Sequence, residues 1–291
     1  NKSLINMTCH MAIPALHRGH VSRTSLTVPC ARLTVCMPAL ASTSGREAAP
    51  KVRLLSRDDF VEADNQWIRA ASYLRAHSFG IYPEDRSEYA KRAHLLISAK
   101  DALEQMQCGL CLGVSQGSSA VKVSTPSKEV AFFPVIASLR RSDISAGHLH
   151  GDDDLAAIEA VVSGGVHVHI PSKDPDQTEY VCGTLDITVG NKLPSEELVG
   201  KLGESDNRAY LSNVCVLASL RKRGVARAMI ESACAHASKL DVKHMYVHVV
   251  EDNVAAQKLY EKCGFAVEQK ELVNVARGLN RPPRLLLHRK L

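Results

Sequence analysis

The clearest alternation of apolar and polar positions lies in the last third of the chain. Residues 179–189 and 209–218 predict two long strands separated by a polar segment. In residues 225–240, apolar side chains return about every fourth position, which predicts a helix with one buried face. Residues 243–250 are rich in β-branched side chains and predict a further strand. This part of the chain is therefore expected to form a sheet covered by helices.

A capped helix and two short strands are expected to close the chain. Asn253 is a good N-cap residue and Gly264 suits the position after a helix, so both ends of this helix are marked. Residues 265–268 and 284–288 predict strands. The order strand, loop, strand, helix, strand, helix, strand predicts an α/β (α+β) fold with a mixed central sheet and flanking helices.

Weaker patterns fill the earlier part of the chain. The elements expected there are, in chain order, a strand at 52–55, helices at 58–77 and 87–107, a loop at 113–128, a strand at 131–139, a short helix at 155–162 and a strand at 165–170. No apolar run approaches the roughly 18 residues that a membrane-spanning helix needs, so neither such a helix nor a membrane partner is expected.

Charge divides the chain near residue 46. Residues 1–46 contain five basic and ten hydroxyl side chains but no Asp or Glu, which is typical of an organellar transit peptide. We therefore expect residues 1–48 to be a disordered transit peptide and residues 49–291 to be the domain. Richness in hydroxyl groups favours the chloroplast stroma over the mitochondrion, and a cytosolic tail is the alternative. The other 31 Lys and Arg equal the 31 Asp and Glu, so no nucleic-acid partner is expected.

Cysteine and histidine spacing gives no complete metal site. Cys108 and Cys111 form one CxxC without a second pair, so a redox pair or half of a metal site stands as the alternative to free thiols. The pairs His148–His150 and His167–His169 lack a third ligand, and no metal is expected. Four cysteines in apolar segments are expected to be small core residues: Cys182, Cys215, Cys234 and Cys263.

A basic turn joins the strand at 209–218 to the next predicted helix. Arg221-Lys-Arg-Gly-Val-Ala226 has the form [Q/R]-x-x-G-x-[G/A]. Gly224 allows a tight turn, and the N–H groups at the start of the helix can meet an anion. The arginines add positive charge, so the turn suits a pyrophosphate, although no P-loop Gly-Lys-Ser/Thr follows. A plain basic surface turn is the alternative.

A second motif follows in the capped helix, Asn253-x-x-Ala256-x-x-Leu259-Tyr260-x-x-x-Gly264-Phe265. Together the two motifs resemble the GNAT superfamily of acetyl-CoA-dependent N-acetyltransferases from about Tyr180 to Leu291, with a motif core at 178–291. The segment Ala209–Leu217 most resembles plant organellar GNAT enzymes and the catalytic subunits of protein N-terminal acetyltransferases. The resemblance implies the GNAT fold, in which two neighbouring strands splay apart and bind CoA.

The resemblance also implies a set of site residues. The cofactor-binding positions are Val214, Cys215, Val216, Arg221, Arg223, Gly224, Val225, Ala226, Arg227, Asn253 and Tyr260. The backbone of 214–216 would pair with pantetheine, and the N–H of Val216 or a neighbour would hold the oxyanion. The amides of 223–227, with Arg221, would bind the pyrophosphate. Asn253 would cap its helix and reach the pantetheine arm, and Tyr260 would protonate or hydrogen-bond the departing thiolate.

The base departs from the usual family pattern. Many GNAT enzymes carry a Glu five residues before the motif Asn, where this chain has His248. A His there resembles one branch of the N-terminal acetyltransferases, which pairs it with a Tyr on the preceding strand, here Tyr210. His248, with a reference pKa of about 6.5, would accept a proton through a water that Tyr210 orders. Plain packing roles for both residues, and Glu251 as a fallback base, are the alternatives.

The expected function is transfer of an acetyl group from acetyl-CoA to an amine. Direct attack in a ternary complex is expected, without an acyl-enzyme on Cys215. The expected partner is a protein or peptide amine, either an N-terminal α-amine or a lysine side chain, and the oligomeric state is left open. Segments 68–86 and 274–283 would face this acceptor. A small-molecule amine, or a CoA-binding module without catalysis, are the alternatives.

Overall fold

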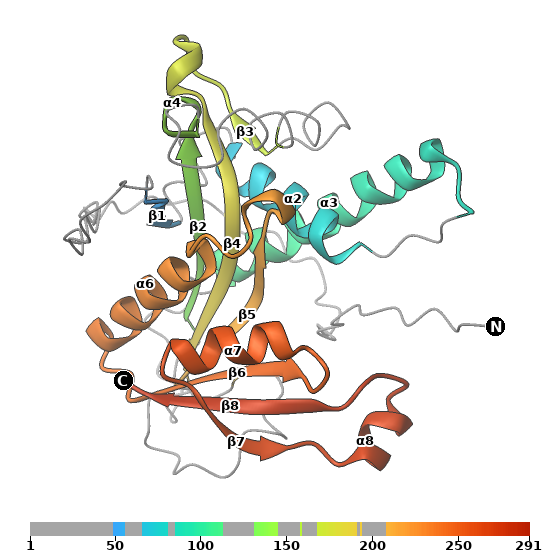
Figure 1. The fold of residues 1–291 in the computed structure, drawn as a ribbon, viewed down its shortest axis with the longest axis vertical. Coiled ribbons are helices and arrows are strands. Elements are labelled where there is room, and N and C mark those ends of the chain that lie inside the picture. Colours follow the sequence, from blue (N-terminus) through green and yellow to red (C-terminus); the bar gives the residue numbers. More distant parts are fainter. Residues whose placement is uncertain are drawn as a thin grey trace, which may run out of the picture.

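The computed structural model describes residues 49–55, 66–80, 85–112, 131–144, 158, 168–190, 193 and 208–291. These residues form one mixed sheet of eight strands with helices on both of its faces (Figure 1). The strands are β1 (Lys51–Leu54), β2 (Ala131–Arg140), β3 (His169–Ile170), β4 (Glu179–Gly190), β5 (Arg208–Val216), β6 (His244–Val250), β7 (Ala266–Lys270) and β8 (Arg284–Lys290). The helices are α2 (Gln66–Phe79), α3 (Glu88–Leu112), α4 (Arg141–Asp143), α6 (Val225–Lys239), α7 (Val254–Lys262) and α8 (Val273–Gly278).

The strand order in the sheet is β1-β2-β4-β5-β6-β8-β7, and β3 pairs with the end of β4. Among the described strands, β5 and β6 make the one parallel pair, which α6 connects. All the other pairs are antiparallel. In Figure 1, β2 and β4 stand vertically and run in opposite directions, while β6, β8 and β7 run across the lower part, so the sheet turns strongly near β5. The α/β class with a mixed sheet and flanking helices is confirmed.

Side chains alternate between the two faces of β4. Thr184 and Asp186 meet Arg75 of α2 on one face. Gly183 points to the other face, where a side-chain Cβ would come within 2.7 Å of Met229 of α6. Glycine at this position therefore lets α6 pack closely on the sheet. The fold thus fixes the position of the turn that begins α6.

Most of the predicted elements are present. Two short helices were missed. α4 has only three residues, and the six residues of α8, Val-Asn-Val-Ala-Arg-Gly, are too few and too rich in β-branched side chains to show a helical period. The helix predicted at 58–77 is described from Gln66 and ends at Phe79. The expected loops at 113–128 and 190–207, the short helix at 155–162 and the transit peptide lie wholly or largely outside the described residues. No described helix has the length and apolar character needed to cross a membrane.

Candidate active site

Strands β5 and β6 pair only over the first part of their length. The register runs from Arg208 opposite His244 to Leu211 opposite Val247, and no pairing follows within the described residues. Residues 212–216 and 248–250 continue as strands on either side of what we call the β5–β6 opening. Backbone groups that face this opening are free to pair with an extended ligand, as with an added strand.

A bulge in β5 sits at the opening. Thr184 of β4 pairs with Cys215 and Asp186 pairs with Ser212, so two residues of β5 oppose one residue of β4. Asn213, the first of the two bulged residues of β5, has a left-handed backbone with φ of 53°.

Beyond the bulge the backbone direction can be followed residue by residue. The N–H of Leu217 donates to the Cys182 carbonyl across β4. Because hydrogen-bonding direction alternates along an antiparallel strand, the backbone of Val216 faces the opposite side. Arg221 Nε donates to the Val216 carbonyl from that side, at 3.2 Å. The backbone of Val216 therefore faces the β5–β6 opening, together with that of Val214.

The structure brings Tyr210 and His248 together where the strands part. Tyr210 Oη lies 2.9 Å from Nδ1 of His248, one residue before and one residue after the last strand pair. The two rings are tilted at 53° with centroids 5.5 Å apart. Nε2 of the same imidazole is buried and has no hydrogen-bond partner within the described residues. The ring thus has one nitrogen fixed by the phenol and one left for a water or a proton.

The surroundings of His248 lower its pKa below the value expected from the sequence. Burial, with the nearby Arg284 and Arg281 guanidinium groups, lowers the pKa of His248 to about 4, and Glu271 opposes this shift. The reference pKa of about 6.5 used for the sequence-based prediction is therefore too high for this site. His248 is neutral throughout the neutral pH range and can accept a proton, although it is a weak base.

Tyr260 belongs to the main core cluster, separate from the small cluster that holds Tyr210, and lies within electrostatic range of Tyr210. It lies on α7, is 5% exposed, and meets Phe265 edge to face with ring centroids 5.6 Å apart. Burial raises the pKa of Tyr260 well above its usual range, and the nearby phenol of Tyr210 adds to the shift. Tyr260 therefore keeps its proton at neutral pH and can act only as a hydrogen-bond donor or acid.

The basic turn before α6 leaves several backbone N–H groups without a helical acceptor. Gly224 caps the helix with φ of 78°, and its carbonyl accepts the first helical hydrogen bond from the Ala228 N–H, at 2.9 Å. The N–H groups of residues 225–227 come before that bond and have no helical acceptor. A Cβ at Gly224 would meet no atom within 4 Å. The space above the turn is therefore open, and the turn has the donors and the room that a pyrophosphate requires.

Not every predicted positive charge is free to bind an anion. Arg227 Nε donates to Glu231 Oε1 at 2.7 Å, so its charge is partly neutralised on the helix surface. Arg221 is held toward the β5–β6 opening by the Val216 carbonyl. The fallback base Glu251 forms an ion pair with Lys270, which reduces its suitability as a base.

Asn253 caps α7 by accepting a hydrogen bond from the Ala256 N–H, at 3.1 Å. Its side chain is exposed. The predicted end of the helix is also present, because Gly264 follows it with φ of 80°. This places the first turn of α7 directly after β6, close to the end of the opening.

The cysteines expected in the core are buried free thiols: Cys182, Cys215, Cys234 and Cys263. Burial raises the pKa of the Cys215 thiol to about 11, against the opposing influence of Arg75 and Ser78. Cys215 pairs with Thr184 and shares its face with Arg75, away from Val216. Cys108 and Cys111 lie on α3. Within the described residues no group of three His, Cys, Asp or Glu side chains is placed to hold a metal ion.

Two buried ionic groups escaped the sequence reasoning. Arg75 of α2 pairs with Asp186 of β4, and both side chains are almost fully buried. Glu271 binds Arg281 through two hydrogen bonds of 2.5 and 2.6 Å beside α8. The partners lie 111 residues apart along the chain in the first pair and ten in the second, so neither pair leaves a signal in the local pattern. A charged residue inside an otherwise apolar run, such as Asp186 in β4, was the one available clue.

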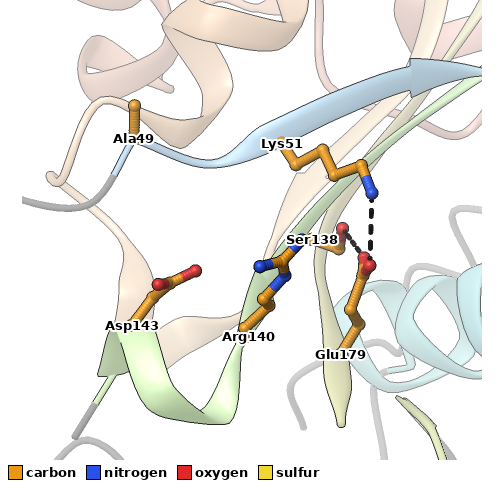
Figure 2. A pocket seen from close by; sticks show the side chains of 6 residues that line it. All are labelled: Ala49, Lys51, Ser138, Arg140, Asp143 and Glu179. Atoms are coloured by element: carbon orange, nitrogen blue, oxygen red, sulfur yellow. Dashed lines mark hydrogen bonds and ion pairs between the residues drawn. The ribbon is translucent and has the colours of Figure 1, made fainter. Parts of the chain in front are cut away.

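A separate polar cavity of about 200 Å³ lies where β1, β2 and β4 meet. Its lining residues are Ala49, Lys51, Ser138, Arg140, Asp143 and Glu179 (Figure 2). Glu179 accepts from Ser138 Oγ at 2.6 Å and from Lys51 Nζ at 3.3 Å. These contacts satisfy the carboxylate within the protein, and none of the predicted site residues lines this cavity.

Two plant acetyltransferases are similar to part of this chain. The chain is 43% identical over 117 residues to GCN5-related N-acetyltransferase 7, chloroplastic, of Arabidopsis thaliana, covering 39% of this chain and 43% of that protein. It is 37% identical over 98 residues to GCN5-related N-acetyltransferase 6, chloroplastic, of the same plant, covering 30% of this chain and 34% of that protein. The matched part therefore spans less than half the length of either relative.

A solved structure and a family model also align with this chain. Arabidopsis thaliana NAA60 in complex with acetyl-CoA aligns with 84% of this chain and 99% of its own, at 13% identity and a TM-score of 0.44. Residues 155–265 match the model of the acetyltransferase (GNAT) family. This segment contains the β5–β6 opening, the basic turn and Tyr260. The chain carries a GNAT acetyltransferase domain.

Proposed function

We propose that the protein transfers an acetyl group from acetyl-CoA to an amine, and that protein N-terminal α-amines are its first acceptors and lysine side chains its second. The observation that carries the proposal is the β5–β6 opening, with the Tyr210–His248 pair where the strands part and Tyr260 within electrostatic range of Tyr210. Acetyl-CoA supplies an activated thioester. Every other part of the reaction falls to side chains and backbone of this chain.

Two structural features would bind acetyl-CoA: the first turn of α6 and the backbone of β5. The N–H groups of 225–227, which have no helical acceptor, and the positive charge of Arg221 and Arg223 would hold the pyrophosphate. The backbone of residues 214–216 would pair with the pantetheine amides, and the N–H of Val216 would point at the thioester oxygen. Asn253, exposed at the start of α7, would reach the same arm.

The proton transfers are assigned to His248 and Tyr260. In the tautomer whose Nδ1–H donates to Tyr210 Oη, Nε2 of His248 keeps a lone pair and takes the amine proton, directly or through one water. Tyr260, held protonated by burial, donates a hydrogen bond to the departing thiolate. Cys215 keeps its proton at neutral pH and faces away, which supports direct attack of the amine rather than an acyl-enzyme.

The weakness of the base favours α-amines over lysines. An α-amine has a reference pKa of about 8, so about half of it is already unprotonated at pH 8. A lysine amine, with a pKa of about 10.4, is less than about 1% unprotonated at that pH. With a pKa of about 4, His248 assists an amine that has already lost its first proton more readily than it deprotonates an ammonium group.

The place of action is proposed to be the chloroplast stroma, with the mitochondrion as the alternative. Residues 1–46 have the acid-free, hydroxyl-rich composition of a transit peptide. Both relatives reported above are named as chloroplastic proteins.

The deciding experiment measures CoA release by the purified full chain with acetyl-CoA and matched acceptors. One peptide offers only a free α-amine, a second offers only a lysine with its N-terminus blocked, and a third arm contains small polyamines. Turnover on the first peptide exceeding that on the second is expected. Turnover on polyamines alone would favour the small-molecule alternative, and bound acetyl-CoA without turnover would favour a non-catalytic CoA-binding module.

A further inference from the structure

A buried ionic network lies directly beneath the β5 bulge. Arg75 of α2 donates from Nη1 and Nη2 to the two Asp186 oxygens at 2.8 and 2.5 Å, and Nη2 also donates to Thr184 Oγ1 at 3.0 Å. The Arg75 and Asp186 side chains are 5% and 2% exposed. Burying two charges costs desolvation energy that their attraction barely recovers, and an apolar pair would stabilise the fold as well. Stability alone is thus a weak reason for this network.

Among the described residues, the network is connected to the surface at the bulge. Asp186 Oδ2, which accepts from Arg75, also accepts from Asn213 Nδ2 at 2.8 Å. Asn213 is exposed and occupies the left-handed position of the bulge. A carboxylate that Arg75 holds rigidly therefore fixes the side chain, and with it the backbone, of the bulged residue.

The bulge determines where the following N–H groups point. Without it, Cys215 could not pair with Thr184 while Ser212 pairs with Asp186. A shift by one residue would turn Val216 away from the β5–β6 opening. The direction of the Val216 N–H thus depends on the conformation at Asn213.

We propose that Arg75 and Asp186 act through Asn213 as positioning residues, which aim the β5 backbone N–H groups at the carbonyl of the acetyl donor. This inference rests on the proposed function. It adds residues on α2 and β4 to the site, neither of which touches the reacting atoms. The alternative is that the network only fastens α2 to the sheet.

Asn213→Gly separates the two roles. Glycine adopts the left-handed backbone freely, so the variant loses the link to Asp186 without steric strain and keeps the buried Arg75–Asp186 pair intact. Glu179→Gln is the matched control, because it disturbs an ionic cluster on the same strand, seven residues and roughly 23 Å from Asp186. The main readout is the infrared band of the carbonyl of ¹³C-acetyl-CoA bound to the full chain. Dissociation constants, kcat and thermal unfolding accompany it.

In the wild type and in Glu179→Gln we expect the bound carbonyl to absorb at a lower frequency than free acetyl-CoA, because a donor N–H polarises it. In Asn213→Gly the band should move back toward the free value. In the same variant, kcat should fall about tenfold or more, while the dissociation constant for acetyl-CoA stays within about twofold of the wild-type value. The melting temperatures of the two variants should lie within about 3 °C of each other.

The outcomes distinguish the inference from the proposed function. An unmoved band in Asn213→Gly overturns the inference, whatever happens to the melting temperature. A wild-type band equal to that of free acetyl-CoA overturns it as well. A shifted wild-type band that relaxes in Asn213→Gly, in a protein that acetylates no amine, supports the positioning role and overturns the proposed function alone.

Discussion

The phenol oxygen of Tyr210 lies 2.9 Å from Nδ1 of His248, across the point where β5 and β6 stop pairing. This contact fixes the imidazole at the mouth of the β5–β6 opening while leaving Nε2 without a protein partner among the described residues. A histidine that served only to fill the core would be expected to have both ring nitrogens hydrogen-bonded, so the unpartnered Nε2 is the informative feature. The predictions below start from this pair and move outward.

His248→Ala should lower kcat for an α-amine peptide by about 10²-fold, because a positioned base contributes about that much. Since the pKa of His248 is lowered to about 4, its own titration lies far below neutrality. The rise in rate near pH 8 should therefore persist in the variant, because it belongs to the acceptor amine. Rate profiles from pH 5 to pH 9.5 with two peptides of different α-amine pKa would show this, and a limb that disappears with the histidine would contradict it.

Tyr210→Phe tests the other half of the pair. Loss of the hydroxyl frees the imidazole to take either tautomer, and we expect kcat to fall about tenfold with little change in the KM for acetyl-CoA. Tyr246, the fully buried tyrosine opposite Tyr210 on β6, offers Tyr246→Phe as a control for removing a phenol from the same face. Equal kcat losses in the two variants would remove the special role of Tyr210.

Tyr260→Phe should leave the affinity for acetyl-CoA within about twofold and lower kcat by about 10²-fold. The phenol is buried and stays protonated, so in the proposed mechanism it would donate to the departing thiolate, an interaction made only as the reaction proceeds. Isothermal titration with acetyl-CoA, together with steady-state rates, separates the two effects. Unchanged turnover would assign Tyr260 to packing against Phe265.

Gly224→Ala should weaken CoA binding by about tenfold. Its φ of 78° is costly for any side chain, by about 1–2 kcal/mol, so the turn must rearrange its N–H groups. Pantetheine, which lacks the pyrophosphate, should bind both proteins equally. Gly278→Ala on α8 is the matched control, because a Cβ there also meets nothing within 4 Å but the backbone is not left-handed. Equal losses for pantetheine and CoA would place the pyrophosphate elsewhere.

Stability should fall as the pH drops below about 6.5. Burial lowers the pKa of four histidines: His77, His236, His248 and His288. The unfolded chain then binds more protons than the folded one, so the unfolding free energy is fully present above pH 6.5 and declines toward the folded pKa values. For His248, with about 4 against about 6.5, the loss is at most about 3 kcal/mol.

Thermal unfolding between pH 5 and pH 7.5 checks this sign, since the carboxylates titrate below that window. His236→Gln is the informative variant, because His236 packs against Phe133 far from the β5–β6 opening. Its melting temperature should depend less on pH than that of the wild type. A wild type equally stable at pH 5 and pH 7.5 would contradict the assignment of neutral buried histidines.

The sequence carried the local parts of the site and left out the long-range parts. Gly224, Asn253 and Gly264 were predictable because turn and cap chemistry is local, and the structure places all three as turn or cap residues. The bulge at Asn213 was not, because it exists only in the pairing of β5 with β4. The lowered pKa of His248 likewise depends on Arg284 of β8 and on Arg281 in the segment before β8.

The join between β5 and β6 consists of four residue pairs, and it is what holds one half of the sheet to the other. Amide hydrogen exchange should therefore reveal two cooperative blocks, one around β2 and β4 and one around β6 and β8, that open independently. A cofactor that pairs with both sides of the opening would merge these blocks into one. Slowed exchange across β8 and β7 on binding CoA, beyond the two strands that border the opening, would be the sign that the ligand completes the sheet.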